Sequence, residues 1–299
     1  MTTNNFFPSR YPIMCCCMNG VSHNVELAIA VSTAGAMPSL IPTDLKTQIT
    51  HYKKHTGNTD LVVWIKESDI LDSRCIHLLL ALEIKFIELT RNDVDNIEKL
   101  NSMKTYSNLW LDKSFIKNIE FLKENGIKIL RRCHKEPIET FDLIDAVCVK
   151  GKESAGFSSD VTIEDLMQMQ KEKTPNAYII SHGGVAGPKD VQKYLSLGAC
   201  AVGVGTLFAA SEESCIDKSV KELMVRKSSK DITRFEDTKQ NALVINAEHT
   251  EFDGFNRSES LNLGIQGRGG HIYAGPSIDG VTKLRTVKET VEYLTSEIK

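Results

Sequence analysis

The sequence lacks an excess of basic residues, a long hydrophobic run and an apolar leader. Its 36 Lys and Arg are slightly outnumbered by 39 Asp and Glu, which gives a net charge of −3. Such a balance argues against nucleic acid as the main partner, because proteins that bind the phosphate backbone concentrate Lys and Arg. The longest aliphatic run, residues 78–82, is too short to cross a membrane. The N-terminus, MTTNNFFPSR, does not resemble a signal peptide, so we expect a cytoplasmic protein.

Signatures of metal and dinucleotide binding are also missing. The chain has eight cysteines, but none forms a C-x-x-C pair and no Cys/His cluster has zinc spacing, so we predict no metal site. Cys148 lies in an expected strand and is interpreted as a packed thiol. The run Cys15-Cys16-Cys17 is interpreted in the same way, with a reactive thiol as the alternative. No G-x-G-x-x-G follows the first expected strand, which argues against a classical dinucleotide fold.

The chain alternates between short apolar runs and amphipathic helical patterns. Its 299 residues suffice for one large domain with a buried core. Eight strands separated by helices favour an α/β fold, a closed (β/α)8 TIM barrel, over an open sheet. The expected strands cover residues 12–17, 36–41, 61–65, 85–89, 127–131, 145–150, 177–181 and 200–204.

The alternation breaks after Phe208. Residues 211–260 are charged and poor in strand patterns, and we expect helices near 214–226 and 238–246. We therefore predict a small, mainly helical lid over the barrel mouth. The predicted organisation is a barrel of residues 1–212 and 262–299 with a lid of residues 213–261. Two further helices are expected, a short one near 93–100 and a final one that begins at Thr286.

The most informative segment is AYIISHGGVAGPKDVQKYLSLGACAVGVGTLF, residues 177–208. One strand ends in Gly183 and Gly184, and the next ends near Gly205 and Thr206. Glycine lets bare backbone N–H groups approach an anion closely, and a phosphate there also meets a helix N-terminus. The last two units of a TIM barrel build a phosphate site in this way. We therefore predict a phosphate site at these four residues.

Two further loops follow expected strands. Met18, Asn19 and Gly20 come after the first strand, and the segment KGKESAG, which begins with Lys150 and Gly151, comes after the sixth. The carboxyl ends of all barrel strands lie on one face, where the active sites of this fold are found. A flat ligand with a phosphate tail suits this arrangement of loops.

These segments resemble the nitronate monooxygenase family, also called 2-nitropropane dioxygenases, which includes FMN-dependent enoyl-ACP reductases. YPIMCCCMNGVSHNVELAIAVSTAGAMPSL is similar to the opening of that family. VKGKESAGFSSD is similar to its strand-six motif, usually Q-G-x-E-A-G-G-H. ISHGGVAGPKDVQKYLSLGACAVGVGTLF is similar to its phosphate segment. The four matching regions, the glycine-rich closing stretch included, occur in the correct order.

The resemblance implies FMN as the cofactor, with the phosphate held at the four residues named above. Met18, Asn19 and Gly20 are then expected to pack against the isoalloxazine ring, and Lys150 and Gly151 to lie near its pyrimidine edge. The sequence also departs from the family. Phe157 stands at the position of the family's catalytic His, and a Phe cannot transfer a proton.

Other departures also fall in the expected pocket. Trp64 aligns with a polar Asn of the family, Lys150 with a Gln, and Cys17 with a Pro. These changes indicate that the pocket over the flavin has been rebuilt.

Three residues are the candidates for catalysis. Lys150 is expected to act as a cation near flavin N1, or else to reach solvent or pair with Glu153. His182 either points toward the ligand or is a hydrogen-bonded structural residue. His271, or Tyr273 beside it, is a replacement for the missing acid/base, in a segment that folds over the site.

The first functional hypothesis is an FMN-dependent, nitronate monooxygenase-like oxidoreductase that oxidises a small nitronate-type substrate with oxygen. Three alternatives stay open: an enoyl-thioester reductase that uses NAD(P)H, a catalytically impaired flavin-binding protein, and a lyase or isomerase whose phosphate site holds a substrate. The expected partner is a small-molecule substrate, and a homodimer is possible.

Overall fold

The computed structural model describes residues 6–90, 110, 112–133, 143–235, 239–246 and 257–298. Eight parallel strands form one sheet within these residues. They are β1 (Ile13–Cys15), β2 (Ser39–Leu40), β3 (Val62–Lys66), β4 (Phe86–Thr90), β5 (Lys128–Cys133), β6 (Ala146–Val149), β8 (Tyr178–His182) and β9 (Ala201–Val204).

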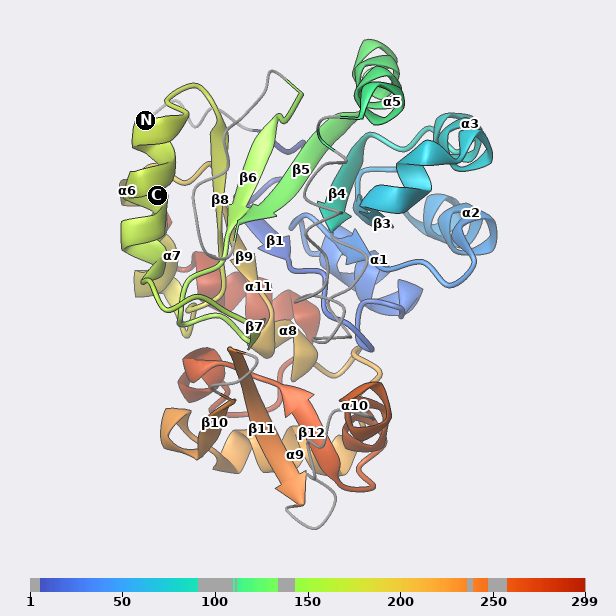
Figure 1. Ribbon diagram of the computed structural model, residues 1–299. Coiled ribbons are helices and arrows are strands. Elements are labelled where there is room, and N and C mark those ends of the chain that lie inside the picture. The colour runs from blue at the N-terminus through green and yellow to red at the C-terminus, as the bar shows by residue number, and fades with distance from the viewer. Residues whose placement is uncertain are drawn as a thin grey trace.

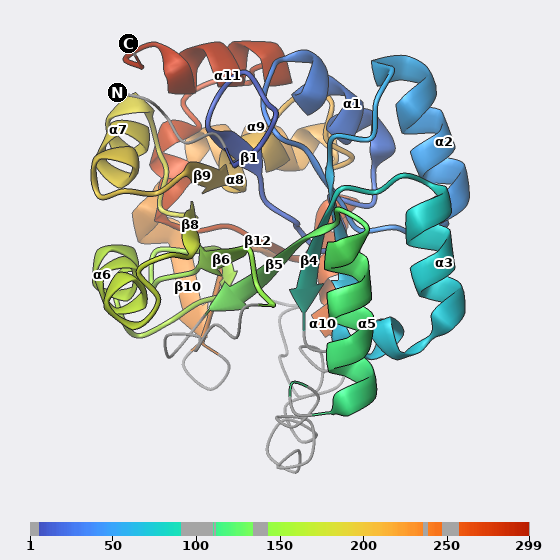
Figure 2. The ribbon, with the colours of Figure 1, turned by 90° about the horizontal axis from the view of Figure 1, so that it is seen from above.

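The strand order closes the sheet into a barrel. The strands follow one another as β1-β9-β8-β6-β5-β4-β3-β2, and a bridge between Met14 and Met37 joins the two ends. Figure 2 looks down on this ring and shows helices around it. The TIM barrel expected from the sequence is confirmed.

Helices cover the outside of the barrel. The amphipathic pattern and the N-cap of α5 illustrate why they form: Asp112 accepts hydrogen bonds from two backbone N–H groups, and Phe115, Ile119 and Leu122 face the core. The expected helix at 93–100 lies outside the described residues. The outer helices are α1 (Val25–Thr33), α2 (Leu45–Thr56), α3 (Ser73–Ala81), α5 (Lys113–Glu124), α6 (Ile163–Lys173), α7 (Pro188–Ser196) and α11 (Val287–Thr295). A short buried helix, α8 (Thr206–Ala209), follows β9, and 3-10 turns lie at Glu67–Leu71 and Pro276–Gly280.

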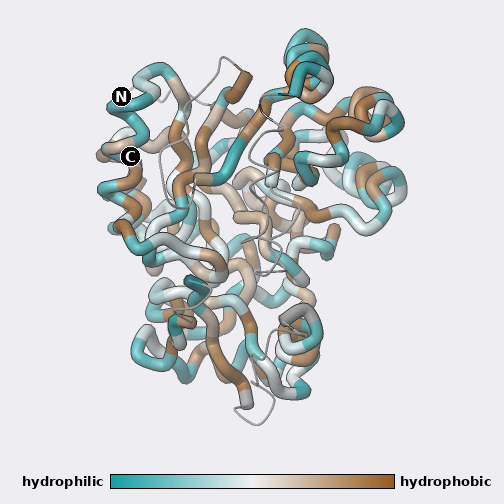
Figure 3. The backbone as a smooth tube through the Cα atoms, viewed as in Figure 1, coloured by the Kyte–Doolittle hydropathy of each residue, from teal (hydrophilic) through white to brown (hydrophobic). Residues whose placement is uncertain are grey.

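The barrel interior changes from apolar to polar along its axis. Near the amino ends of the strands, the rings of Phe7 and Phe86 lie 5.3 Å apart and close the barrel. Figure 3 shows the hydrophobic colour along the barrel strands. Near the carboxyl ends, Glu88 and His182 are fully buried polar residues. The polar part of the interior therefore lies beneath the loops that the sequence identified.

A smaller unit, the cap, lies at the carboxyl ends of the barrel strands (Figure 1). Its strands form an antiparallel sheet in the order β10-β11-β12. The barrel contributes a short strand, β7 (Gly156–Phe157), which pairs with β11. The cap consists of α9 (Lys218–Arg226), a 3-10 turn at Ser229–Asp231, β10 (Ile232–Phe235), β11 (Gln240–Asn246), α10 (Arg257–Ile265) and β12 (Gly270–Tyr273).

The cap corrects one expectation from the sequence. The helix expected over residues 238–246 is wrong, because β11 occupies residues 240–246 of this segment. The run Ala242-Leu243-Val244-Ile245 has the β-branched content of a strand, and pairing with β7, β10 and β12 supplies the partners that a strand needs. The helix expected near 214–226 is present as α9. The boundaries at residues 213 and 261 stay a prediction.

The C-terminal helix secures the outside of the barrel. Thr286 and Glu289 form a capping box at the start of α11, and Val287, Val291 and Leu294 are buried. This helix contacts both α1 and α7. Across the part of the chain that the structure describes, no helix combines the length and apolar character needed to cross a membrane.

Candidate functional site

A cavity of about 440 Å³ lies between the carboxyl ends of the barrel strands and the cap. This volume falls within the range of small-molecule and cofactor pockets. Loops from most of the barrel strands contribute to its wall, and Tyr273 reaches it from β12. The lining includes Cys16, Cys17, Met18, Asn19, Trp64, Arg132, Lys150, Ser154, Phe157, His182, Gly183, Gly205, Thr206, Tyr273 and Ser277.

The glycine loop after β8 packs too tightly for side chains. Gly183 has φ +90°, and a Cβ atom there would lie 2.8 Å from Cα of Ser154. Gly184 has φ +69°, and its Cβ would lie 2.7 Å from the Tyr194 hydroxyl. Both positions therefore require glycine, for conformation and for space. Gly183 lines the cavity, whereas Gly184 faces α7 and is not among the cavity residues.

Hydroxyl groups lie beside this loop. Thr206 begins α8 and lines the cavity with Gly205. Its hydroxyl oxygen accepts a hydrogen bond from the Ser277 hydroxyl at 3.1 Å. The Gly183 N–H donates to the Gly203 carbonyl at 2.9 Å and is therefore already engaged. The polar groups at this end of the cavity are the Thr206 and Ser277 hydroxyls and the backbone around Gly205.

The loop after β1 supplies another wall. Met18 and Asn19 line the cavity. Gly20 does not, because it faces the cap: a Cβ there would lie 2.3 Å from Cδ1 of Ile265. Gly151 is also outside the lining and packs against the start of α6, where its Cβ would lie 2.3 Å from the Ile163 nitrogen.

Lys150 occupies the floor of the cavity, directly after β6. Its Nζ donates a hydrogen bond to the Ala155 carbonyl at 3.1 Å. Burial and, second, the positive charge of Arg132 lower the pKa of Lys150 to about 7. Because Lys150 lines the cavity and is only partly exposed, its side chain faces the cavity rather than bulk solvent. Glu153 instead accepts a hydrogen bond from the Ile163 N–H at 3.1 Å and orders the loop.

A buried ion pair beneath the cavity was missed by the sequence reasoning. Arg132 on β5 pairs through Nε with the Glu88 carboxylate on β4, and its other arm donates to the Cys17 carbonyl at 3.1 Å. Arg132 lines the cavity, and Glu88 lies below it. Part of the signal was present in the sequence, since Glu88 is the one charged residue of the buried strand β4, and β5, the next strand, carries basic residues.

His182 is buried at the end of β8, where it also lines the cavity. Burial lowers its pKa to about 3, so the ring is neutral at physiological pH. Gly203 on the next strand makes room for it, because a Cβ there would lie 2.4 Å from Cδ2 of the His182 ring. His182 therefore lies in the barrel core and also contributes to the cavity wall.

The two remaining acid/base candidates lie in different places. His271 is fully buried in the cap, where its Nδ1 lies 2.9 Å from the Ser260 hydroxyl, and it is not among the residues that line the cavity. Tyr273, two residues later on β12, does line the cavity. Phe157 and Trp64 also contribute to the lining. The cap therefore brings Tyr273, rather than His271, to the site.

Comparison with known proteins decides the family. A family described as nitronate monooxygenase matches residues 39–266, well over half of the chain. The chain belongs to the nitronate monooxygenase family. This membership assigns it to the oxidoreductases.

Solved structures share the fold of this family member. FabK from Thermotoga maritima is 22% identical with a TM-score of 0.74, and the match covers 97% of this chain and 93% of that one. A nitroalkane oxidase from Streptomyces ansochromogenes is 18% identical with a TM-score of 0.69, covering 97% and 96%. The enoyl reductase domain of MlnA from Bacillus amyloliquefaciens is 11% identical with a TM-score of 0.68, covering 97% and 94%.

Proposed function

We propose that this protein is an FMN-dependent oxidoreductase that oxidises a small nitronate-type substrate with oxygen. The observation that carries the proposal is the composition of one cavity. Gly183, Gly205 and Thr206 line it together with Lys150 and Arg132, so a glycine-rich polar end and a cationic floor belong to the same space. This combination suits a ligand with a phosphate tail and a ring that becomes anionic when it is reduced.

The phosphate end fits the cofactor. The tight glycine packing at Gly183 keeps side chains out of this corner, and the Thr206 and Ser277 hydroxyls offer hydrogen bonds. We assign the phosphate to these groups and to the backbone around Gly205. Gly184 packs against Tyr194 on the side of the loop that faces away from the cavity. Met18 and Asn19 would then flank the flavin ring, which accepts electrons from the substrate and passes them to oxygen.

The cationic floor supports an anionic ligand. Lys150 carries a proton that it can hold or release near neutral pH, because burial lowers its pKa to about 7. Arg132 stays charged, although Glu88 balances much of its charge. We assign Lys150 to the pyrimidine edge of the flavin, where a positive charge favours the anionic reduced form.

The lining at Phe157 bears on the substrate. A Phe side chain cannot remove a proton, and it stands where the resemblance places the catalytic His. A nitronate is already the deprotonated form of a nitroalkane, so its oxidation needs no base to create the carbanion. An enoyl-thioester reductase needs a proton donor at the substrate carbon. A nitronate is therefore a better substrate than an enoyl thioester for a cavity that has Phe157 at this position.

The test begins with the isolated protein. We expect a yellow protein that releases FMN on denaturation and consumes oxygen when an alkyl nitronate is added. A colourless protein that does not take up FMN would contradict the proposal and favour a lyase or isomerase. Flavin bleaching by NADH or NADPH without oxygen, together with no reaction toward nitronates, would favour the reductase. Inactivity in both assays would leave a flavin-binding protein.

Association between copies is a separate prediction. The sequence is compatible with a homodimer, and light scattering after size-exclusion chromatography measures the mass directly. A particle mass of twice 33.3 kDa is the expected result for the dimer, and 33.3 kDa would contradict it.

A further inference from the structure

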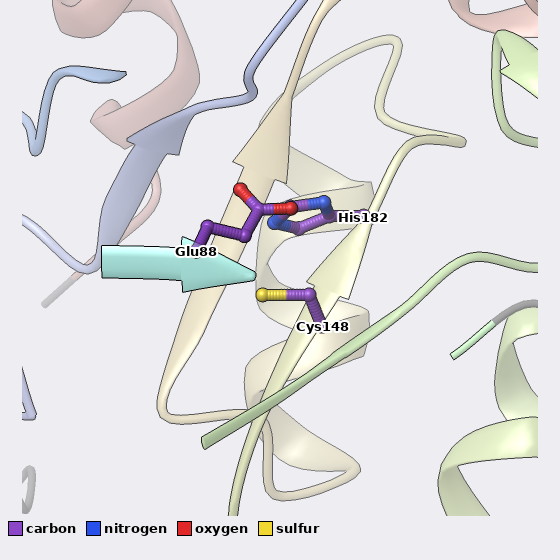
Figure 4. A group of neighbouring side chains, drawn as sticks. All are labelled: Glu88, Cys148 and His182. Carbon is purple, nitrogen blue, oxygen red and sulfur yellow. The ribbon is translucent and has the colours of Figure 1, made fainter. Parts of the chain in front are cut away.

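Three potential metal ligands meet inside the barrel, directly beneath the cavity. Glu88 comes from β4, Cys148 from β6 and His182 from β8, and their donor atoms all lie within 4.8 Å of one another. Figure 4 shows the carboxylate and the imidazole side by side, with the sulfur atom below them. Each side chain is at most 1% exposed. The closed barrel brings together residues that lie far apart in sequence, so no spacing motif reveals them.

Two atoms of this group lack a partner. In the described part of the chain, neither Oε2 of Glu88 nor Nε2 of His182 has a hydrogen-bond partner, although both are buried. Arg132 engages only the other carboxylate oxygen. An unsatisfied buried polar atom is unfavourable, and native structures contain few of them. A cation bound among the three side chains would give this buried carboxylate and imidazole a common partner.

The protonation states suit coordination. His182 is neutral because burial lowers its pKa, so one ring nitrogen keeps a lone pair. The Glu88 carboxylate is held ionised, since the positive charge of Arg132 leaves its pKa below the ordinary value despite burial. Burial raises the pKa of the Cys148 thiol, which is therefore protonated without a metal. Metal binding would displace this proton, as it does for other thiol ligands.

We propose that Glu88, Cys148 and His182 bind a transition-metal ion, with Zn²⁺ as the first choice. One thiolate, one imidazole and one carboxylate match the donors that zinc prefers, and three protein ligands leave a fourth position open. Zinc bonds of about 2.0–2.3 Å place tetrahedral ligands roughly 3.3–3.7 Å apart, so the group needs to contract by at most about 1.5 Å. An ion can enter through the cavity, because His182 lines it.

Charged groups and thiols surround the three proposed ligands. Zn²⁺ with one thiolate and one carboxylate is neutral, which leaves the positive charge of Arg132. Lys150 also faces the group, and the Cys16 and Cys17 thiols lie nearby; the Cys17 thiol interacts with the Glu88 carboxylate. This site does not depend on the proposed FMN.

Cobalt provides a direct probe, because Co²⁺ reports thiolate ligation in its absorption spectrum. We expect chelator-treated protein to bind one equivalent of Co²⁺ with a thiolate-to-metal charge-transfer band, and Zn²⁺ to displace it. Zn²⁺ should also raise the unfolding temperature, since a ligand that binds only the folded state stabilises it. Absence of stoichiometric binding, with water taking the place of the ion, would overturn the proposal.

Matched variants identify the ligands. Cys148→Ser should abolish the charge-transfer band, whereas Cys200→Ser, a half-buried thiol outside the cavity lining, should keep it. His182→Gln should keep the band and weaken Co²⁺ affinity at least tenfold. This variant tests the site independently if Cys148→Ser does not fold. A band that survives in Cys148→Ser, or an unchanged affinity in His182→Gln, would overturn the assignment. Flavin content, measured in parallel, reports on the proposed function alone.

Discussion

The surroundings of Lys150 shift its pKa far from the ordinary value of a lysine. It ends a barrel strand, and a lysine there commonly reaches solvent. Here the cavity wall encloses its side chain, and Nζ has the Ala155 carbonyl as a partner. The lowered pKa follows from this burial and from the nearby Arg132.

The stability of the protein should record this lowered pKa. The folded protein releases the Lys150 proton at a pH of about 7, whereas the unfolded chain keeps it up to about 10.5. Between these values the unfolded state binds more protons, so this group makes the free energy of unfolding rise with pH. Buried cysteines act in the opposite direction, because their pKa values are raised on folding.

The variant Lys150→Met isolates the effect. We expect its stability advantage over the wild type to be greatest near pH 7 and to shrink toward pH 10, as measured by urea unfolding in the absence of ligand. Lys54→Met on the exposed side of α2 is the control and should show no such trend. Parallel pH profiles for wild type and Lys150→Met would contradict the assigned pKa.

Arg132 and Glu88 form a pair in which each charge depends on the other. Arg132→Met should lower the free energy of unfolding by about 3–5 kcal/mol, because it leaves a buried carboxylate without its counter-charge. The double variant Glu88→Gln with Arg132→Met should recover part of this loss. Chemical denaturation of chelator-treated protein measures both. A double variant less stable than Arg132→Met alone would contradict this account of the pair.

Among the elements, the β8–α7–β9 unit is the part that the sequence predicts best. Its strands are short and apolar, Pro188 starts the helix, and glycines mark both strand ends. All these signals are local, so no tertiary information is needed to interpret them. The close contact of Gly183 with Ser154 is different, because it depends on a loop from another strand.

Replacing Gly183 should show how much of the need for glycine at this position comes from close packing rather than from its positive φ. Gly57 provides the matched control, since it also has a positive φ but would place a Cβ in open space. Gly57→Ala should cost only the left-handed conformation, roughly 1–2 kcal/mol. Gly183→Ala should cost about 1–3 kcal/mol more, from overpacking against Ser154, and should weaken FMN binding. Equal losses of stability in urea unfolding would contradict the close-packing argument.

The β11 strand shows where sequence patterns fail. Residues 238–246 contain no strict alternation, and their neighbours are charged. The strand conformation of β11, residues 240–246, depends on pairing with β7, which the chain provides about eighty residues earlier. The same limit applies to Glu88, Cys148 and His182, since only the closed barrel brings these three strands together. Local propensity does not contain this information.

Asn241 connects β11 to the loop after β6. Its amide donates to the carbonyls of Lys152 and Ser154 at 2.9 and 2.8 Å. Asn241→Ala should lower stability by about 1–3 kcal/mol, because it removes a buried donor from two acceptors. Asn125→Ala, which loses one exposed hydrogen bond at the end of α5, is the control and should cost less. Equal costs in thermal unfolding would argue against an anchoring role for Asn241.

At the scale of the whole molecule, the cap and the barrel share one cavity. Tyr273 and Ser277 belong to the segment that returns from the cap to the barrel. Phe157 belongs to β7, which pairs with β11 of the cap. Composition and strand count were enough to predict the barrel, since the alternation of β and α units is a global pattern. They could not predict which cap residues face the cavity, because that depends on the pairing of β11 with β12.

Closure of the ring has a consequence for biosynthesis. β1 pairs with β9, so Ile13 cannot pair with Val202 until the chain has been synthesised through β9. A nascent chain that has not yet emerged past β9 exposes the free edge of β1, and unpaired edges are prone to aggregation. Contacts between such distant positions also slow folding. Closure of the barrel is therefore expected to begin only after β9 has left the ribosome, and chains stalled before residue 200 should be clients of chaperones.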